Sequence, residues 1–236
     1  MAAECLQPIK HPPLLRAIKR RIWDEVSLGI HGDEVKPHQV GGFEDILPST
    51  TLGAGIMYNT IGSGAQLLMG LAVAPNPAIR QIVEATADSE SQKLMHALRA
   101  QRVLSGFRMI DLGCGMAPTL AMTARSLGAD MSTVDGEEPW SDYRELLANH
   151  SVMDMSAPGA PAVLTEETGG GFDYVTTNII DCVPGHPQWK VPERATFHRF
   201  ADLLLVDGGV YYKSDGPARD QDLLQKQIAP PICAGA

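Results

Sequence analysis

The chain has 236 residues, of which 44% are hydrophobic and 20% are charged, so it can form one large α/β domain with a buried core. No apolar run approaches the roughly 20 residues needed to cross a bilayer, and the first residues lack a secretory signal pattern. The four cysteines are widely spaced and form no CxxC pair, which argues against a zinc ribbon or a disulfide scaffold. We therefore expect a soluble protein of a reducing compartment, the cytoplasm, without a metal site.

The formal net charge of −9 is unevenly distributed along the chain. Residues 1–100 hold 10 acidic and 9 basic residues, whereas residues 101–236 hold 18 acidic and 10 basic residues. An acidic C-terminal part is unsuited to tight, sequence-independent contact with phosphate backbones. A nucleic-acid partner is therefore disfavoured, although a local basic groove is not excluded.

Residues 1–90 are predicted to form a largely helical cap or lid. Residues 14–26 place apolar side chains on one helical face, including Leu15, Ile18 and Ile22, after a Pro-Pro start. Residues 31–66 are rich in Gly, Pro, Ser and Thr and predict loops. Further helices are expected at about 65–74 and 77–103, the second of them broken. We place the second domain at residues 91–236.

From residue 106 the pattern changes to short strands that alternate with helices. Strands are predicted at 108–112, 130–134, 172–177 and 210–213, with a weaker one that ends at Asp154. Helices are predicted at 118–127, 140–149 and 194–205, and a Gly- and Pro-rich loop precedes residue 172. This alternation indicates an α/β fold with a mainly parallel sheet and right-handed crossovers.

After the last of these strands only residues 214–236 remain in the sequence. Residues 220–228 can form a helix, but residues 229–236, rich in Pro and Ala, cannot form an antiparallel pair of strands. An uncovered edge strand is an aggregation hazard. We therefore expect this edge to be covered by residues 31–75, by a second copy in a homodimer, or by a partner chain.

The end of the first strand in this part of the chain carries the residues best suited to bind a ligand. In parallel sheets, ligands bind beyond the carboxyl ends of the strands. Gly113 and Gly115 let the backbone turn tightly there, and Asp111 offers a carboxylate to a cationic group or its water shell. Asp135 lies 20 residues after Gly115, at the end of the next strand, where it can accept hydrogen bonds from both hydroxyls of a ribose.

Several motifs in this order resemble those of the class I S-adenosylmethionine-dependent methyltransferases, over about residues 90–215. Ile110–Gly115 is similar to the first motif of that family, with Ala117 at its third glycine. Phe172–Val175 resembles the fourth-strand motif, and residues 204–212 resemble the turn into the fifth strand. The resemblance implies a Rossmann-like methyltransferase domain that binds S-adenosyl-L-methionine and releases S-adenosyl-L-homocysteine. The cofactor-binding residues that it implies are Asp111, Gly113, Cys114, Gly115, Asp135, Asp154, Met155 and Asn178.

Two other interpretations of the glycine motif remain open. A nicotinamide dinucleotide site requires GxGxxG, but Pro118 stands at the third glycine position, and Asp111 would add a negative charge near the diphosphate. The second interpretation is a strand-to-helix turn that binds no ligand.

Catalytic candidates follow the fourth strand of this part of the chain. Methyl transfer is an in-line displacement, so the enzyme aligns the two reactants and manages the proton of the acceptor. Asp181 or His186 can act as general base toward a hydroxyl or phenol, and His198 is a further candidate. Residues 178–181 (Asn-Ile-Ile-Asp) lack the prolines and the aromatic residue of the amino-group methyltransferase motif, which disfavours that subgroup.

The leading hypothesis is a methyltransferase that acts on a small organic acceptor, with O-methylation slightly favoured over N- or C-methylation. One alternative is a protein that binds S-adenosylmethionine without transferring the methyl group, either as a partner subunit or as a cyclase. Another is an RNA ribose 2′-O-methyltransferase, which Lys213 suggests. The acidic charge of the C-terminal part disfavours that last hypothesis.

Overall fold

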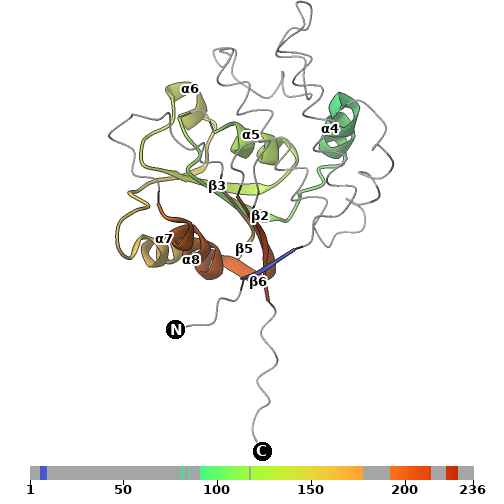
Figure 1. Cartoon of the computed structure of the whole chain (residues 1–236). Coiled ribbons are helices and arrows are strands. Elements are labelled where there is room, and N and C mark those ends of the chain that lie inside the picture. Colours follow the sequence, from blue (N-terminus) through green and yellow to red (C-terminus); the bar gives the residue numbers. More distant parts are fainter. Residues whose placement is uncertain are drawn as a thin grey trace, which may run out of the picture.

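The structure is a computed structural model of the chain (Figure 1), and it describes residues 6–9, 81, 85, 91–116, 118–177, 192–213 and 222–227. The helices with defined bounds are α4 (Ser91–Ala100), α5 (Thr119–Ser126), α6 (Ser141–Arg144), α7 (Ala160–Thr168) and α8 (Arg194–Leu204). The strands are β1 (Leu6–Pro8), β2 (Arg108–Leu112), β3 (Asp130–Asp135), β4 (Asn149–Val152), β5 (Phe172–Thr177), β6 (Leu205–Lys213) and β7 (Asp222–Lys226). Among these residues, no helix is long and apolar enough to span a membrane.

The strands form one seven-stranded sheet in the order β1-β7-β6-β5-β2-β3-β4. Strands β2 to β6 are parallel to one another, while β7 is antiparallel to both of its neighbours, β6 and β1. Figure 1 shows α7 and α8 on one side of the sheet and α4, α5 and α6 on the other. This is a Rossmann-like α/β fold with a mainly parallel sheet, as the sequence predicts.

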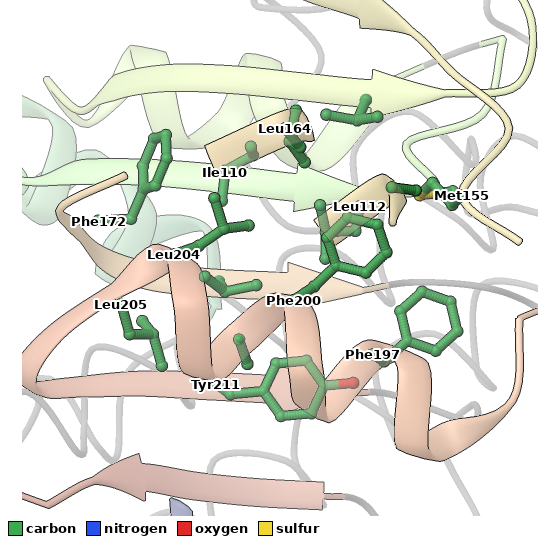
Figure 2. Packing of buried hydrophobic residues seen from close by; sticks show 14 of the residues in the cluster. Ile110, Leu112, Met155, Leu164, Phe172, Phe197, Phe200, Leu204, Leu205 and Tyr211 are labelled. Carbon is green, nitrogen blue, oxygen red and sulfur yellow. The ribbon is translucent and has the colours of Figure 1, made fainter. Parts of the chain in front are cut away.

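Alternation along the strands divides the buried side chains between the two faces of the sheet. The face toward α7 and α8 is apolar, and its core includes Ile110, Leu112, Leu164, Phe200 and Leu204 (Figure 2). The opposite face carries the alternate positions of the same strands. Near the carboxyl ends these positions are polar and buried: Asp111, Thr133 and Thr176. Buried polar side chains are costly unless they are paired, so this opposite face of the sheet is where we look for a functional site.

The predicted strands at 108–112, 130–134 and 172–177 and the predicted helices at 118–127 and 194–205 are confirmed within one or two residues. The helix predicted at 140–149 is shorter, because Asn149 pairs with Ser132 and begins β4. Of the broken helix predicted at 77–103, the structure describes α4. The amphipathic helix predicted at 14–26, the loops at 31–66 and the helix at 65–74 lie outside the described residues.

Two predictions for the second domain are wrong. The Gly- and Pro-rich stretch before residue 172 contains helix α7, which has a proline in its first turn and ends at the left-handed Gly169. Residues 222–226, which were expected to be helical, form strand β7 instead. Leu223 and Leu224 are both buried there, because pairing with β6 and β1 places their side chains on the two faces of the sheet. Tertiary contacts here outweigh the helix propensity of Leu, Gln and Lys.

The outer edge of β6 is paired with β7, and β7 in turn is paired with β1. Leu6, Gln7 and Pro8 stand opposite Lys226, Gln225 and Leu224, so part of the predicted cap belongs to the sheet. The edge of β6, which was expected to need cover from residues 31–75 or another chain, is therefore covered by β7. Pro8 lies on the outermost strand, where its missing N–H interrupts no ladder between inner strands.

Arg108 fastens the amino end of β2 to the end of α7. Its guanidinium donates to the carbonyl oxygens of Gly170 at 2.6 Å and Thr168 at 3.3 Å, and it lies 4.7 Å from the ring centre of Phe172. Thr168 is the last residue of α7, so this cation also faces the negative end of the helix. The contact with Asp130 is longer, at 3.9 Å.

Arg108→Ala is expected to lower the free energy of unfolding by about 1–2 kcal/mol, because several charge-assisted hydrogen bonds are lost at a partly exposed site. Urea unfolding measures the change. Arg144→Ala is the matched control, because Arg144 is similarly exposed (46% against 42%) but has a surface ion pair with Glu138. Its expected cost is below about 1 kcal/mol. Equal losses in the two variants would contradict the role given to Arg108.

Candidate functional site

The glycine turn after β2 is built onto the end of β3. Gly113 and Gly115 have φ angles of +75° and +71°, a left-handed conformation that costs a side-chain-bearing residue energy. The N–H groups of Gly113 and Cys114 both donate to the carbonyl oxygen of Val134, at 2.8 and 3.2 Å. The turn is thus fixed against the neighbouring strand, at the edge of the sheet where the sequence predicts a ligand.

Asp135 lies at the centre of this arrangement, at the carboxyl end of β3. The N–H of Gly115 donates to its Oδ2 at 2.7 Å, and the N–H of Glu137 donates to its Oδ1 at 3.3 Å. Its own carbonyl oxygen accepts from Met153 at 2.8 Å. A carboxylate has about four lone-pair positions, so two N–H donors leave room for two hydroxyl donors. The orientation of the carboxylate is therefore set before any ligand arrives.

Asp111 is only 1% exposed and lies under the turn, between Thr133 on β3 and Thr176 on β5 in register. Thr176 donates to its Oδ1 at 2.9 Å. Burial, and to a smaller extent the charge of Asp135, raises the pKa of Asp111 from 3.8 to about 7, although the Thr176 hydrogen bond opposes the rise. The charge that acts on Asp111 is the carboxylate of Asp135, so no cation among the described residues offsets its burial.

Cys114 is the one predicted binding residue with a thiol. Its Sγ donates to the Gly115 carbonyl oxygen at 3.5 Å. Burial, followed by the charges of Asp111 and Asp135, raises the pKa of this thiol well above its usual range. Cys114 therefore stays protonated at neutral pH and is a poor nucleophile, which fits a packing role in the turn.

Asp154 and Met155 follow β4 and differ in exposure. Asp154 is exposed, and its Oδ1 accepts from the N–H of Ser156 at 2.9 Å and from the Ser156 hydroxyl at 2.6 Å. Met155 is 8% exposed and belongs to the core cluster shown in Figure 2. Asp154 thus has its side chain at the surface near the ends of β3 and β4, while the Met155 side chain packs inside.

The predicted catalytic residues Asp181 and His186 lie outside the described residues, as does Asn178. His198 is described: it lies on α8, and its ring meets the Tyr211 ring edge to face, with centroids 5.8 Å apart. Tyr211 is fully buried in the core cluster. The contact favours the interpretation of His198 as a packing residue.

Three polar residues of the sheet were not predicted as site residues: Thr133, Thr176 and His150. Thr133 and Thr176 occupy the same alternate face as Asp111, and each is hydrogen-bonded to a side chain of a neighbouring strand. A polar residue at an inward position of a buried strand is a signal that could have found the two threonines. The partner across the sheet cannot be assigned without strand order and register, which one sequence does not supply.

No family model matches the chain, and no curated protein matches it. Solved structures match it over part of its length. SMU.776 in complex with SAH is 15% identical, with a TM-score of 0.38, and the match covers 52% of this chain and 34% of that one. The 16S rRNA N2 G1207 methyltransferase RsmC of T. thermophilus, in complex with AdoMet and guanosine, is 19% identical, with a TM-score of 0.36 and coverages of 66% and 44%.

The [4+2]-cyclase SpnF is 13% identical, with a TM-score of 0.32, and the match covers 64% of this chain and 59% of that one. This chain thus spans about a third of SMU.776, less than half of RsmC and little over half of SpnF. The assignment of the fold rests on the order and directions of the strands described above.

Proposed function

We propose that the chain is an S-adenosylmethionine-dependent methyltransferase that acts on a small organic acceptor, with oxygen the favoured acceptor atom. One observation carries the proposal. The Asp135 carboxylate is held at the carboxyl end of β3 by the N–H of Gly115, 2.7 Å away, in the glycine turn of the neighbouring strand β2. A carboxylate fixed beside a glycine turn suits a nucleoside with two free ribose hydroxyls and an aliphatic arm that runs along the turn.

The residues on this edge fit that cofactor. Asp135 would accept from the ribose hydroxyls, and the exposed carboxylate of Asp154 would face the amino group of the adenine. A Cβ at Gly115 would meet no atom of the described residues within 4 Å, so they leave space beside the turn on this side. Asp111 lies under the turn, where its negative charge would favour an ammonium group above it.

When bound, S-adenosylmethionine supplies a methyl group on a positively charged sulfur, which leaves as S-adenosylhomocysteine. The protein aligns the acceptor in line with that bond and accepts its proton. Asp181 and His186 remain our proposals for the base, because both follow β5 in the sequence. Strand β5 lies beside β2 and parallel to it, so the chain leaves β5 at the edge that holds the glycine turn.

An uncovered edge at the last parallel strand would favour a partner subunit that binds the cofactor without methyl transfer. Strand β7 pairs with β6, so that ground for the alternative is weaker. A fold alone does not separate a methyltransferase from a cyclase. Detection of a methylated product distinguishes them.

The test begins with calorimetric titration of S-adenosylmethionine and S-adenosylhomocysteine. We expect dissociation constants on the order of micromolar for the wild type, and Asp135→Ala is expected to weaken binding by about 10- to 100-fold, because two hydrogen bonds to a charged group are lost. Asp130→Ala is the matched control, because it removes a carboxylate from the opposite end of the same strand, β3. We expect it to bind like the wild type.

A panel of phenols, alcohols, amines and carbon acids then identifies the acceptor class by release of S-adenosylhomocysteine. A folded wild type that binds neither compound would overturn the proposal. Binding without any methylated product would favour the non-methylating alternative.

A further inference from the structure

Beneath the ribose-binding carboxylate, two polar side chains of neighbouring strands form a pair. Thr133 on β3 stands in register with His150 on β4, and its Oγ1 lies 2.9 Å from His150 Nδ1. Thr133 is 1% exposed. Asp135 follows Thr133 by two residues on the same strand, so both side chains emerge on the same face of the sheet. The pair therefore lies one step below Asp135.

The hydrogen bonds indicate how protons are placed in this pair. Thr133 Oγ1 also lies 3.3 Å from the carbonyl oxygen of Asn149, to which its single proton can be donated. With the proton placed there, the hydroxyl lone pair can accept from Nδ1–H of His150, and in this tautomer of the neutral ring Nε2 carries no proton. Nε2 is buried and has no hydrogen-bond partner among the described residues. In a neutral ring, Nε2 is a buried acceptor without a described donor. In a protonated ring it would be a buried, charged donor, which costs more free energy, so the neutral ring is favoured.

Several groups of the loop after β3 lie close enough to this ring to shift its pKa. The backbone of Glu137, the side chains of Glu138 and Asp135, and Arg144 of α6 all act on it. Burial lowers the pKa of His150 below 6.5, and Arg144 lowers it further, against the opposing effects of Glu137, Glu138 and Asp135. The same loop holds the carboxylate, because the N–H of Glu137 donates to Asp135 Oδ1. The Glu138–Arg144 pair, 3.1 Å apart, ties the loop to α6.

We propose that Thr133 and His150 act as a positioning pair for residues 135–138, holding Asp135 in the orientation that accepts the two ribose hydroxyls, and that the pair does so only while His150 is neutral. This inference rests on the proposed function. Protonation of His150 places a positive charge beside Asp135 and Glu138. Both carboxylates are then drawn toward the ring, and Asp135 turns away from the ligand.

The test is calorimetric titration of S-adenosylhomocysteine at about pH 7.5, with the melting temperature of each free protein measured in parallel. Thr133→Val keeps the shape and removes the hydroxyl, and His150→Phe keeps a ring and removes its nitrogens. We expect each to weaken binding about tenfold, and the double variant to be little worse, since both changes break one contact. His150→Asn keeps an amide that can meet the Thr133 hydroxyl and should bind within about threefold of the wild type.

Thr123→Val is the matched control, because Thr123 is also fully buried but donates to the Thr119 carbonyl oxygen within α5. It is expected to change the melting temperature and leave the affinity within about twofold. If the pair had only a structural role, Thr133→Val and His150→Phe would likewise change the melting temperature and leave the affinity within about twofold. That result would overturn the inference.

The pH dependence of affinity gives an independent readout. Below about pH 6.5 the wild type is expected to lose affinity more steeply than His150→Asn. The variant has no imidazole to protonate, whereas Asp111 is protonated in both proteins. Parallel pH profiles would contradict the proposal. Wild-type binding that is unaffected by any of these variants overturns this inference alone, whereas absence of wild-type binding overturns the proposed function.

Discussion

Replacing Asp111 with Asn is expected to stabilise the protein above neutral pH, by up to about 4 kcal/mol, and to have a much smaller effect below pH 5. Asp111 is buried under the glycine turn, and its pKa is raised from 3.8 to about 7. The amide is isosteric and still accepts the hydrogen bond from Thr176, but it never ionises. Its N–H₂ group needs an acceptor, which reduces the gain by about 1–3 kcal/mol if none is met.

The sign follows from the two pKa values of this group. Below about pH 4 the carboxyl is protonated in both the folded and the unfolded chain, so there is no penalty. Between about 4 and 7 the unfolded chain releases the proton first, so the stability contributed by this group falls as the pH rises. Above about 7 both states are ionised and the penalty is constant, because the folded state holds a buried charge without a described counter-ion.

Urea unfolding of the wild type and Asp111→Asn between about pH 5.5 and 8.5 measures this difference. It should grow up to about pH 7 and then remain level. Asp130→Asn is the control, because Asp130 is 65% exposed and a change there should cost less than about 1 kcal/mol at any pH. A difference between Asp111→Asn and the wild type that does not vary with pH would show that the carboxyl is ionised throughout.

Gly209→Ala is expected to lower the free energy of unfolding by about 2–3 kcal/mol through overpacking. A Cβ at this position would lie 2.9 Å from the carbonyl oxygen of Val206, 3.0 Å from Leu205 Cδ2 and 3.1 Å from the carbonyl oxygen of Phe172. Two of these atoms are backbone, so relief requires the strands to move. The position lies where the register of β5 and β6 shifts, between Phe172 and Tyr174.

Gly136→Ala is the matched control for this substitution. A Cβ there would meet no described atom within 4 Å, so the free energy of unfolding should change by less than about 1 kcal/mol. Alanine also lowers the conformational entropy of the unfolded chain, which favours the folded state slightly. Urea unfolding under identical conditions compares the two variants with the wild type. Equal stabilities would mean that the β5–β6 junction adapts without strain.

The parallel strands could be predicted because β2, β3 and β5 are short runs with apolar alternate positions; Gly113 follows β2, and β3 ends in Asp135. Helix α7 was missed although its signals, Pro161 in the first turn and Gly169 at its end, are present in the sequence. Strand β7 has a helix-forming composition, and its conformation depends on β6 and β1, which lie far away along the chain. Local patterns cannot report such pairing.

In the candidate site, too, local features could be predicted from the sequence, whereas contacts between strands could not. Gly113, Gly115 and Asp135 were predicted from spacing, and the structure brings Gly115 and Asp135 together. The Thr176–Asp111 and Thr133–His150 contacts depend on register between strands, with His150 on β4, a strand predicted only weakly. The burial that raises the pKa of Asp111 is likewise a property of the packed sheet.

Strand β1 also bears on how the chain is made. Its residues, Leu6–Pro8, leave the ribosome before every other strand of the sheet, yet their only described strand partner, β7, consists of residues 222–226. During synthesis the parallel strands and α8 are all available before this outermost ladder can form. The entropic cost of closing so long a loop grows only logarithmically with its length, so the β1–β7 contact can be stable at equilibrium. It must nevertheless form late, because β7 is synthesised after all the other strands of the sheet. Until β7 has emerged, the nascent chain presents β6 as an open edge, and this interval is when it most needs protection from other chains.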